Sequence, residues 1–392
     1  MSDEQRKVGV AVVGVGGAVS TTAIAGVELL KVGACGTEGL PFADVESLVP
    51  YTSLVFGGWD LDGDDLAKAA HLHRVLEPGV IEASGAGLAA VTPWPAVADP
   101  DYCRNAVGAN VVPISSLRGR VDHIRTDIER FRTEHDLDRV VVVNLASTER
   151  WPDLTLPSLQ TPEAFEEALD ADDPVISPSM IYAYAAIVSG SPYVNFTPSA
   201  SADIPALLEL ALQRSVPVAG KDGKTGQTMI KTVLAPAFAS RSLHVDGWYS
   251  TNILGNRDGQ VLDDADSLQA KLQTKGNVLD ECLGYHVEDH QVRIDYYKPR
   301  GDEKEAWDNI DLTGFLGQKM QVKVDFLCRD SILAAPLVLE LARMVDEAAR
   351  RKEGGAQEQL GYFFKAPITR DGSEPVHALY RQEQVLREWL AR

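Results

Sequence analysis

The chain has 392 residues, which is too long for one ordinary hydrophobic core and predicts two domains. Its formal net charge of −20 argues against general affinity for nucleic acid or anionic membranes, because both require a basic surface. The same charge would repel a phosphorylated metabolite, so a phosphate site would need a local cluster of cations.

The cysteines and the N-terminal segment bear on the cellular compartment. The four cysteines, Cys35, Cys103, Cys282 and Cys328, include no pair with C-x-x-C spacing, which is typical of reduced thiols in a cytoplasmic protein. The first residues are polar and lack the apolar core of a signal peptide, and no run of about 18 apolar residues occurs. We therefore expect a cytoplasmic protein without a membrane span.

The chain up to about residue 220 alternates between strand-like and helix-like segments. Short apolar runs rich in β-branched residues predict buried parallel strands at 8–13, 51–58, 139–148 and 216–220, with a further strand end in 193–199. Helical periodicity predicts helices at 20–33, 65–76, 121–138, 179–190 and 204–215. This alternation predicts an α/β domain with a doubly wound parallel sheet.

The pattern changes after about residue 240. The segments 244–255, 290–299 and 319–328 are longer, alternate in polarity and predict a mixed sheet with one covered face. A strong helical pattern returns at 331–353. The sequence contains no linker of low complexity, so a second sheet inserted into a nucleotide-binding domain fits better than two successive domains.

A glycine-rich turn follows the first predicted strand. Gly14, Gly16 and Gly17 would allow a sharp turn and the close approach of a pyrophosphate to a helix N-terminus. Val19 occupies the third glycine position of the usual G-x-G-x-x-G pattern, and a tight turn that merely needs glycine is the alternative. Asp60, after the second predicted strand, is the candidate partner for an adenosine ribose.

Two further motifs resemble known sites incompletely. The segment GKDGKTG (220–226) has Val218 where a P-loop requires glycine, so we do not predict an ATPase, although a helix start here could still bind an anion. The segment HVEDH (286–290) is not a zinc-protease motif, and we expect a surface loop and no metal site.

The lysines are concentrated in one region. Seven of the 14 lysines lie between Lys221 and Lys304, and Asp and Asn residues accompany them. Within this region Lys271 and Lys275 are four positions apart, so on a helix their ammonium groups would share a face and repel each other. A solvated helix face is one interpretation. The other is chemistry on a phosphorylated, oxygen-rich substrate, in which ammonium groups bind phosphate or polarise a carbonyl.

Several motifs together identify a family. The segments KTGQT (224–228), NILGNRDG (252–259), PRGDEK (299–304), CRDSILAAP (328–336) and FKAPITR (364–370) occur in this order, after GVGGAVSTT (14–22) and FGGWD (56–60). With the lysine pair, they closely resemble the myo-inositol-1-phosphate synthase family from about residue 8 to 385. The resemblance implies a Rossmann-type NAD-binding domain at 1–224 and 330–392, an inserted α+β catalytic and tetramerisation domain at 225–329, and a homotetramer.

The resemblance also implies roles for individual residues. NAD would be bound by Gly14, Gly16, Gly17, Ala18, Val19, Ser20, Thr21, Asp60, Ser147, Thr148, Asp222, Asn256, Asp258 and Asp330. The substrate would be bound by Thr225, Gly226, Gln227, Asn252 and the four family lysines. The catalytic set would be Lys271, Lys275, Lys304 and Lys365 with Asp222, Asp302 and Asp330, and no metal is implied. Two departures from the family pattern are Ser147, in place of an Asn, and Met229, in place of a lysine of some members.

The family reaction is a redox-neutral cyclisation of a hexose 6-phosphate in inositol biosynthesis. NAD oxidises carbon 5, enolisation makes carbon 6 a nucleophile, an aldol step closes the ring, and the hydride returns. Lys271 and Lys365 would face the sugar oxygens, and Lys275 and Lys304 the phosphate or a transferred proton. D-glucose 6-phosphate is the expected substrate. The alternatives are a five-membered ring from fructose 6-phosphate, an inactive NAD-binding scaffold, and a simple dehydrogenase.

Overall fold

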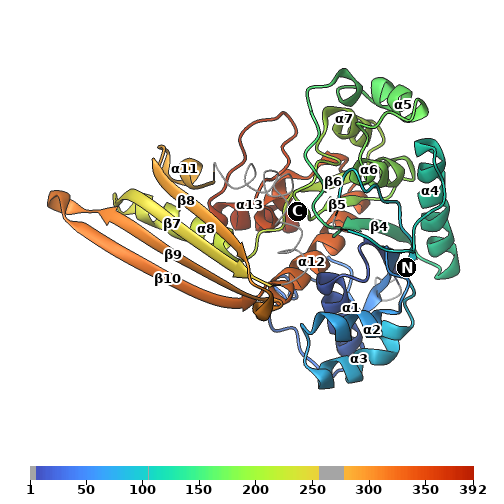
Figure 1. Ribbon diagram of the computed structural model, residues 1–392, viewed down its shortest axis with the longest axis horizontal. Coiled ribbons are helices and arrows are strands. Elements are labelled where there is room, and N and C mark those ends of the chain that lie inside the picture. The colour runs from blue at the N-terminus through green and yellow to red at the C-terminus, as the bar shows by residue number, and fades with distance from the viewer. Residues whose placement is uncertain (1–5, 105, 256–277) are drawn as a thin grey trace.

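The computed structural model describes residues 6–104, 106–255 and 278–392. These residues form two sheets, one inside a compact helical unit and one that extends away from it (Figure 1). None of the helices in the described ranges is long and apolar enough to cross a membrane. The predicted Asn256, Asp258, Lys271 and Lys275 lie outside the described residues.

The first sheet has seven parallel strands in the order β11-β6-β5-β4-β1-β2-β3. The strands are β1 (Val8–Val13), β2 (Leu54–Asp60), β3 (Trp94–Pro95), β4 (Arg139–Asn144), β5 (Tyr193–Asn195), β6 (Pro217–Gly220) and β11 (Gly355–Ala356). After β3 the chain crosses to the other side of β1, so β1 and β4 flank a topological switch point, where such sheets bind ligands. The predicted doubly wound sheet is confirmed.

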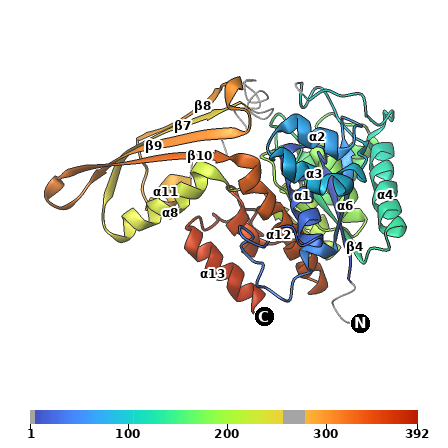
Figure 2. The same cartoon turned by 90° about the horizontal axis from the view of Figure 1, so that it is seen from below.

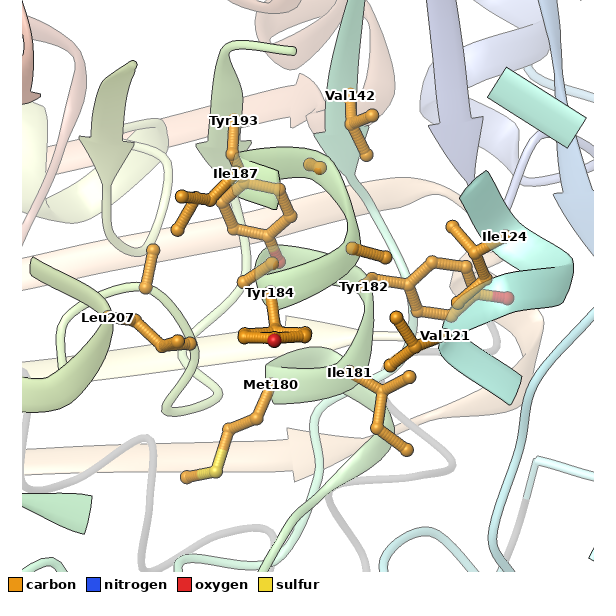
Figure 3. Packing of buried hydrophobic residues seen from close by; sticks show 14 of the residues in the cluster. Val121, Ile124, Val142, Met180, Ile181, Tyr182, Tyr184, Ile187, Tyr193 and Leu207 are labelled. Carbon is orange, nitrogen blue, oxygen red and sulfur yellow. The ribbon is translucent and has the colours of Figure 1, made fainter. Parts of the chain in front are cut away.

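Helices cover both faces of this sheet. They are α1 (Ala18–Lys31), α2 (Leu66–His73), α3 (Pro78–Ala89), α4 (Leu117–Glu134), α5 (Pro162–Asp170), α6 (Pro178–Val188), α7 (Pro205–Gln213), α12 (Asp330–Arg350) and α13 (Leu379–Leu390). One apolar cluster joins the four helices α4, α5, α6 and α7 to the sheet. Figure 3 shows Val121 and Ile124 of α4 with Tyr182 of α6 and Val142 of β4. The other cluster joins α1, α2, α3, α12 and α13 to the opposite face. The strands alternate their side chains between these two clusters, which explains their continuous apolar runs.

The second sheet has four strands in the order β10-β9-β7-β8. They are β7 (His244–Leu254), β8 (Asp289–Tyr296), β9 (Glu303–Thr313) and β10 (Lys319–Arg329). Only the β7–β8 pair is parallel, so the predicted mixed sheet is confirmed. Helices α8 (Gly226–Ser240) and α11 (Val278–Leu283) cover one face, where Trp248, Ile310 and Leu279 form a third apolar cluster (Figure 2).

The element limits differ from the predictions in a few places. The pattern analysis did not predict α3, α5, α11, α13, β3, β9 or β11. Helix α3 is rich in small residues, β9 mixes charged residues into its alternation, and β3 and β11 are two residues long. Strand β4 ends at Asn144, so the predicted 145–148 is a loop. Single 3₁₀ turns lie at Tyr51–Ser53, Pro157–Leu159, Lys298–Arg300, Phe315–Gly317 and Glu358–Phe363.

The chain leaves the first unit after β6 and returns to it through α12. Helix α8 begins at Gly226 and α12 begins at Asp330, and all four strands of the second sheet lie between them. We propose that residues 225–329 form the inserted domain, and that 1–224 and 330–392 form the nucleotide-binding domain.

A glycine in β2 tests how closely β1 and β2 pack. Gly58 has φ +149°, and a Cβ atom there would lie 2.0 Å from the carbonyl oxygen of Val12 in β1. Because that contact is with backbone, Gly58→Ala should lower the free energy of unfolding by about 3 kcal/mol or more, measured by urea denaturation. Gly26→Ala in α1 is the matched control, because its Cβ meets nothing within 4 Å. The control should gain about 0.5 kcal/mol, and equal effects at both glycines would contradict this packing.

Candidate active site

A cavity of about 410 Å³ lies at the carboxyl ends of β1, β2 and β4. Of the residues predicted to bind a dinucleotide, Gly14, Gly16, Gly17, Ala18, Val19, Ser20, Asp60 and Ser147 line it. Thr21, Thr148, Asp222 and Asp330 were also predicted to bind NAD and are described, but they are not among the lining residues. The Thr21 hydroxyl donates to the carbonyl groups of Gly17 and Ala18. The cavity therefore occupies the switch point of the first sheet.

The glycine-rich turn is fixed to β2. Gly14 has φ +87°, a conformation that favours glycine, and its N–H donates to the carbonyl of Trp59 at 2.8 Å. The Asp60 carboxylate accepts from the Gly16 N–H at 2.8 Å and, through its other oxygen, from the Asp62 N–H at 3.1 Å. A Cβ at Gly16 would lie 3.0 Å from that carboxylate. Asp60 thus shapes the turn as well as lining the cavity.

The start of α1 suits a pyrophosphate group. Within the described residues no side chain caps this helix, so its first N–H groups remain available to an anion. The hydroxyl of Ser20 is buried and has no hydrogen-bond partner in the described ranges, although Ser20 lines the cavity. An unpartnered donor beside a glycine turn and a free helix end fit NAD, whose phosphates would accept these hydrogen bonds.

A buried ion pair lies on the other side of the site. The ammonium group of Lys365 is 2.7 Å from the Asp222 carboxylate, and these residues are 8% and 3% exposed. Their backbones are also joined, because the Lys365 N–H donates to the Asp222 carbonyl at 2.7 Å and the Gly223–Phe364 pair forms an antiparallel bridge. This backbone bridge, which we call the strap, brings the C-terminal segment against the loop between β6 and α8.

A second ion pair links the strands of the second sheet to α12. Lys304 of β9 lies 3.5 Å from Asp330, the first residue of α12, and Asp330 also accepts from the Thr225 hydroxyl at 3.0 Å. Burial alone would lower the pKa of Lys304, but the Asp330 carboxylate outweighs burial through its charge and its hydrogen bond, so the net shift is upward. Asp222 and Thr225 lie in the same loop between β6 and α8, so this loop contacts both ion pairs.

The predicted phosphate site lies at the start of α8. Thr225 occupies the N-cap position of α8, and no described side chain accepts a capping hydrogen bond there. A Cβ at Gly226, the first residue of the helix, would lie 3.6 Å from the Lys304 ammonium group. Gln227, one residue further, accepts from the Asn252 amide at 2.6 Å. An uncapped helix start beside an ammonium group can bind a phosphate.

Lys224 is the lysine of the Gly-Lys-Thr motif, and its side chain is engaged elsewhere. It is 4% exposed and donates to the side-chain oxygen of Gln382 in α13. A P-loop lysine must instead reach the phosphates of a nucleotide. The geometry therefore agrees with the expectation that this motif is not an ATPase site.

Asp302 connects the two parts of the site. Its carboxylate accepts from the Ser331 hydroxyl at 2.9 Å and from the Ser331 N–H at 3.2 Å, in the first turn of α12. Both residues also line the dinucleotide cavity. Asp302 was predicted as catalytic, and in this structure it holds the start of α12 at the edge of the cavity.

The two histidines of HVEDH do not form a site together. His286 is exposed and pairs with Asp280 at 2.6 Å, whereas His290 lies in β8 with its Nε2 atom 2.7 Å from the Lys231 ammonium. Burial lowers the pKa of His290 to about 4 and that of Lys231 to about 8. The surface-loop prediction therefore holds for His286 and is wrong for His290. No group of three or more potential metal ligands occurs in the described part of the chain.

The sequence analysis missed most of the residues that line the cavity, among them Ser331 and Glu149. Ser331 lies inside the quoted motif CRDSILAAP, and Glu149 lies two residues after the predicted Ser147. Ser331 follows a predicted aspartate at a helix start, and Glu149 is a carboxyl group in the loop after the buried strand β4. The signal was their place at the carboxyl end of the sheet or at a helix N-terminus.

Lys224 should make stability depend on pH. Burial lowers its pKa to about 7 in the folded chain, against 10.5 when unfolded. Between these values the unfolded chain binds more protons, so the free energy of unfolding should rise with pH by up to about 1.4 kcal/mol per unit. Lys224→Met should remove its own share of this rise in urea denaturation series and leave the share of Lys231, whereas Lys7→Met, at an exposed lysine, should keep the whole rise. An unchanged pH profile in Lys224→Met would refute the assignment.

Comparison with known proteins identifies the family. A model of an NAD-binding family described as myo-inositol-1-phosphate synthase matches residues 36–391. The chain is 40% identical to inositol-3-phosphate synthase 1 of Bacteroides thetaiotaomicron, over 98% of this chain and 95% of that protein. It is 31% identical to isozyme 1 of the Arabidopsis thaliana enzyme, over 91% and 74% of the two chains. The crystal structure of inositol-3-phosphate synthase from Caenorhabditis elegans matches with a TM-score of 0.91 at 28% identity, over 98% and 85% of the chains. The chain belongs to the myo-inositol-1-phosphate synthase family.

Proposed function

We propose that this protein is an NAD-dependent cyclase that converts D-glucose 6-phosphate into a myo-inositol monophosphate. The observation that carries the proposal is the presence of two ion pairs, the buried Lys365–Asp222 and the partly buried Lys304–Asp330, on the loop and helix start beside the cavity at the switch point of the first sheet. The relatives named as inositol-3-phosphate synthases support the substrate class. In a chain of net charge −20, such buried cations are where a phosphorylated sugar can bind.

The cofactor would be held by the glycine-rich turn, the start of α1 and Asp60. When bound, NAD supplies a hydride acceptor and later returns the hydride, so the overall reaction is redox-neutral. The Gly16 and Gly17 backbone and the Ser20 hydroxyl would contact the phosphates. Asp60 lines the cavity and would face the adenosine ribose.

The lysines would stabilise the oxyanions of the ring closure. Enolisation and the aldol step each place negative charge on an oxygen atom, and a fixed ammonium group stabilises that charge best in a buried site. Lys365 is buried and held in place by Asp222, which suits it to a carbonyl oxygen of the sugar. Lys304 has a raised pKa and stays protonated, so we assign it to the phosphate and not to proton abstraction.

The phosphate would bind where α8 begins. The N–H groups of Gly226 and Gln227 and the ammonium group of Lys304 form its surroundings among the described residues. Lys271 and Lys275 lie outside the described residues, and their assignment to the sugar oxygen and the phosphate stays a prediction of the sequence.

Product analysis tests the reaction directly. The purified protein with NAD and either glucose 6-phosphate or fructose 6-phosphate should yield an inositol phosphate only from the first sugar, identified by NMR. Formation of a five-membered cyclitol from fructose 6-phosphate would contradict the proposed substrate and identify fructose 6-phosphate in its place. Accumulation of NADH would indicate a dehydrogenase, and no turnover of either sugar would refute the cyclase assignment.

Substitution of Lys365 tests the proposed site. Lys365→Met keeps the apolar stem and removes the ammonium group, so turnover should fall by about 100-fold or more, because an oxyanion loses its stabilising charge. NAD binding, measured by calorimetry, should be retained and reports that the variant is folded. The control variant Lys7→Met changes an exposed lysine just before β1, and it should turn over substrate at the normal rate. Normal turnover in Lys365→Met would exclude the proposed role.

The oligomeric state is a separate prediction. The homotetramer implied by the resemblance is supported by the outer face of the second sheet, where Trp307 and Leu327 are 37% and 56% exposed. We expect light scattering to give a mass four times the 42.5 kDa of one chain. Trp307→Lys, a charge on that face, should lower the mass, and a monomeric wild-type protein would contradict the proposal.

A further inference from the structure

Glu149 is a buried carboxyl group in the wall of the dinucleotide cavity. It follows β4 by five residues and is 6% exposed. Its backbone N–H donates to the Ser199 hydroxyl at 3.0 Å, and its carboxylate accepts from the Ser179 N–H at 3.0 Å. Glu149 therefore joins three segments: the loop after β4, the loop after β5 and the start of α6.

The contact with α6 uses an N–H group in the first turn of the helix, which has no partner within the helix. Ser177 caps this helix by accepting from the Met180 N–H, and Glu149 satisfies the Ser179 N–H in the same turn. A carboxyl group at a helix N-terminus is favourable both as an acceptor and in the field of the helix. Burial raises the pKa of Glu149 to about 7, while the hydroxyls of Ser177 and Ser179 act against that shift by hydrogen bonding.

Hydrogen bonds continue from Glu149 toward the cavity loop. Asn144, the last residue of β4, donates to the Ser179 hydroxyl at 3.2 Å and accepts from the Ala146 N–H at 3.1 Å. Ala146 and Ser147 line the cavity. Because Glu149 and Asn144 both bind Ser179, they fix the two ends of this loop to one point on α6.

A second chain of hydrogen bonds continues from Glu149 toward the ion pair. The Ser199 N–H donates to the Thr197 hydroxyl at 3.2 Å, and the Thr197 carbonyl accepts from the Asp222 N–H at 3.0 Å. Asp222 then holds the Lys365 ammonium group at 2.7 Å. Ser199, Thr197 and Asp222 are all buried, so water does not compete for these bonds.

We propose that Glu149 is a positioning residue that holds the wall of the cofactor cavity and the Asp222–Lys365 ion pair in one geometry. The inference rests on the proposed function, because it assumes that cofactor and Lys365 act on the same substrate. A hydride acceptor and an oxyanion-stabilising ammonium group must meet neighbouring atoms of one sugar, and displacement by about 1 Å can cost on the order of 100-fold in rate. Glu149 is the group from which hydrogen bonds run to both.

The test compares Glu149→Ala with Glu149→Gln, which keeps a side-chain oxygen for the Ser179 N–H. NAD affinity is measured by calorimetry without sugar, and turnover at saturating NAD and sugar. Asp346→Asn is the matched control, because Asp346 is a buried carboxyl group paired with Arg139 at the opposite end of β4. Thermal melting reports the folded state of every variant.

Glu149→Ala keeps the backbone N–H that donates to Ser199 but removes the carboxylate that anchors Glu149 to α6, so the loop and with it that backbone N–H should shift. NAD binding should therefore weaken by about tenfold, and kcat should fall by at least about tenfold. Glu149→Gln should restore most of both, and Asp346→Asn should lower only the melting temperature. A Glu149→Ala protein that melts earlier but binds NAD and turns over normally would overturn the proposal, because Glu149 would then be a helix cap only. A change in NAD affinity without a change in kcat would overturn the link to Lys365. If the wild-type protein does not cyclise the sugar, the proposed function fails while the NAD measurement still tests the cavity wall.

Discussion

The ion pair between Lys365 and Asp222 organises the site, because it joins segments 143 residues apart in the chain. Two charges buried together are favourable only when their geometry is good and the remaining polar atoms are satisfied. The strap supplies the geometry, since the backbones of the two segments pair on either side of the ion pair. The C-terminal segment is therefore held by the same loop that starts α8. Loss of either charge would leave its partner buried and unpaired.

The distribution of charge follows from the same constraint. The protein as a whole repels anions, so the cations of the described site are kept buried and each is held by a carboxylate. Each ion pair is neutral before substrate arrives, which limits the cost of burying the ammonium groups. The starts of α1 and α8, which no described side chain caps, add positive field without adding charged side chains.

The start of α12 connects the cofactor half to the second sheet. Asp302, just before β9, holds the Ser331 N–H and hydroxyl, and both residues border the dinucleotide cavity. The Asp330 carboxylate, next to Ser331 in the chain, accepts a hydrogen bond from the Thr225 hydroxyl at the start of α8 and forms an ion pair with Lys304 of β9. One helix end thus aligns the nucleotide-binding unit with the strands that carry Lys304. Glu149 would play the corresponding part at the start of α6.

The sequence by itself determined the parallel sheet, the glycine turn and the family, because these depend on local patterns. Apolar runs specify buried strands, positive φ at Gly14 requires glycine, and the motifs occur in a specific order. Only the tertiary structure decided which carboxylate holds which lysine. It also decided that Lys224 faces α13 and that Asp302 caps α12. These are contacts between distant segments, and no periodicity in the chain records where a side chain will find its partner.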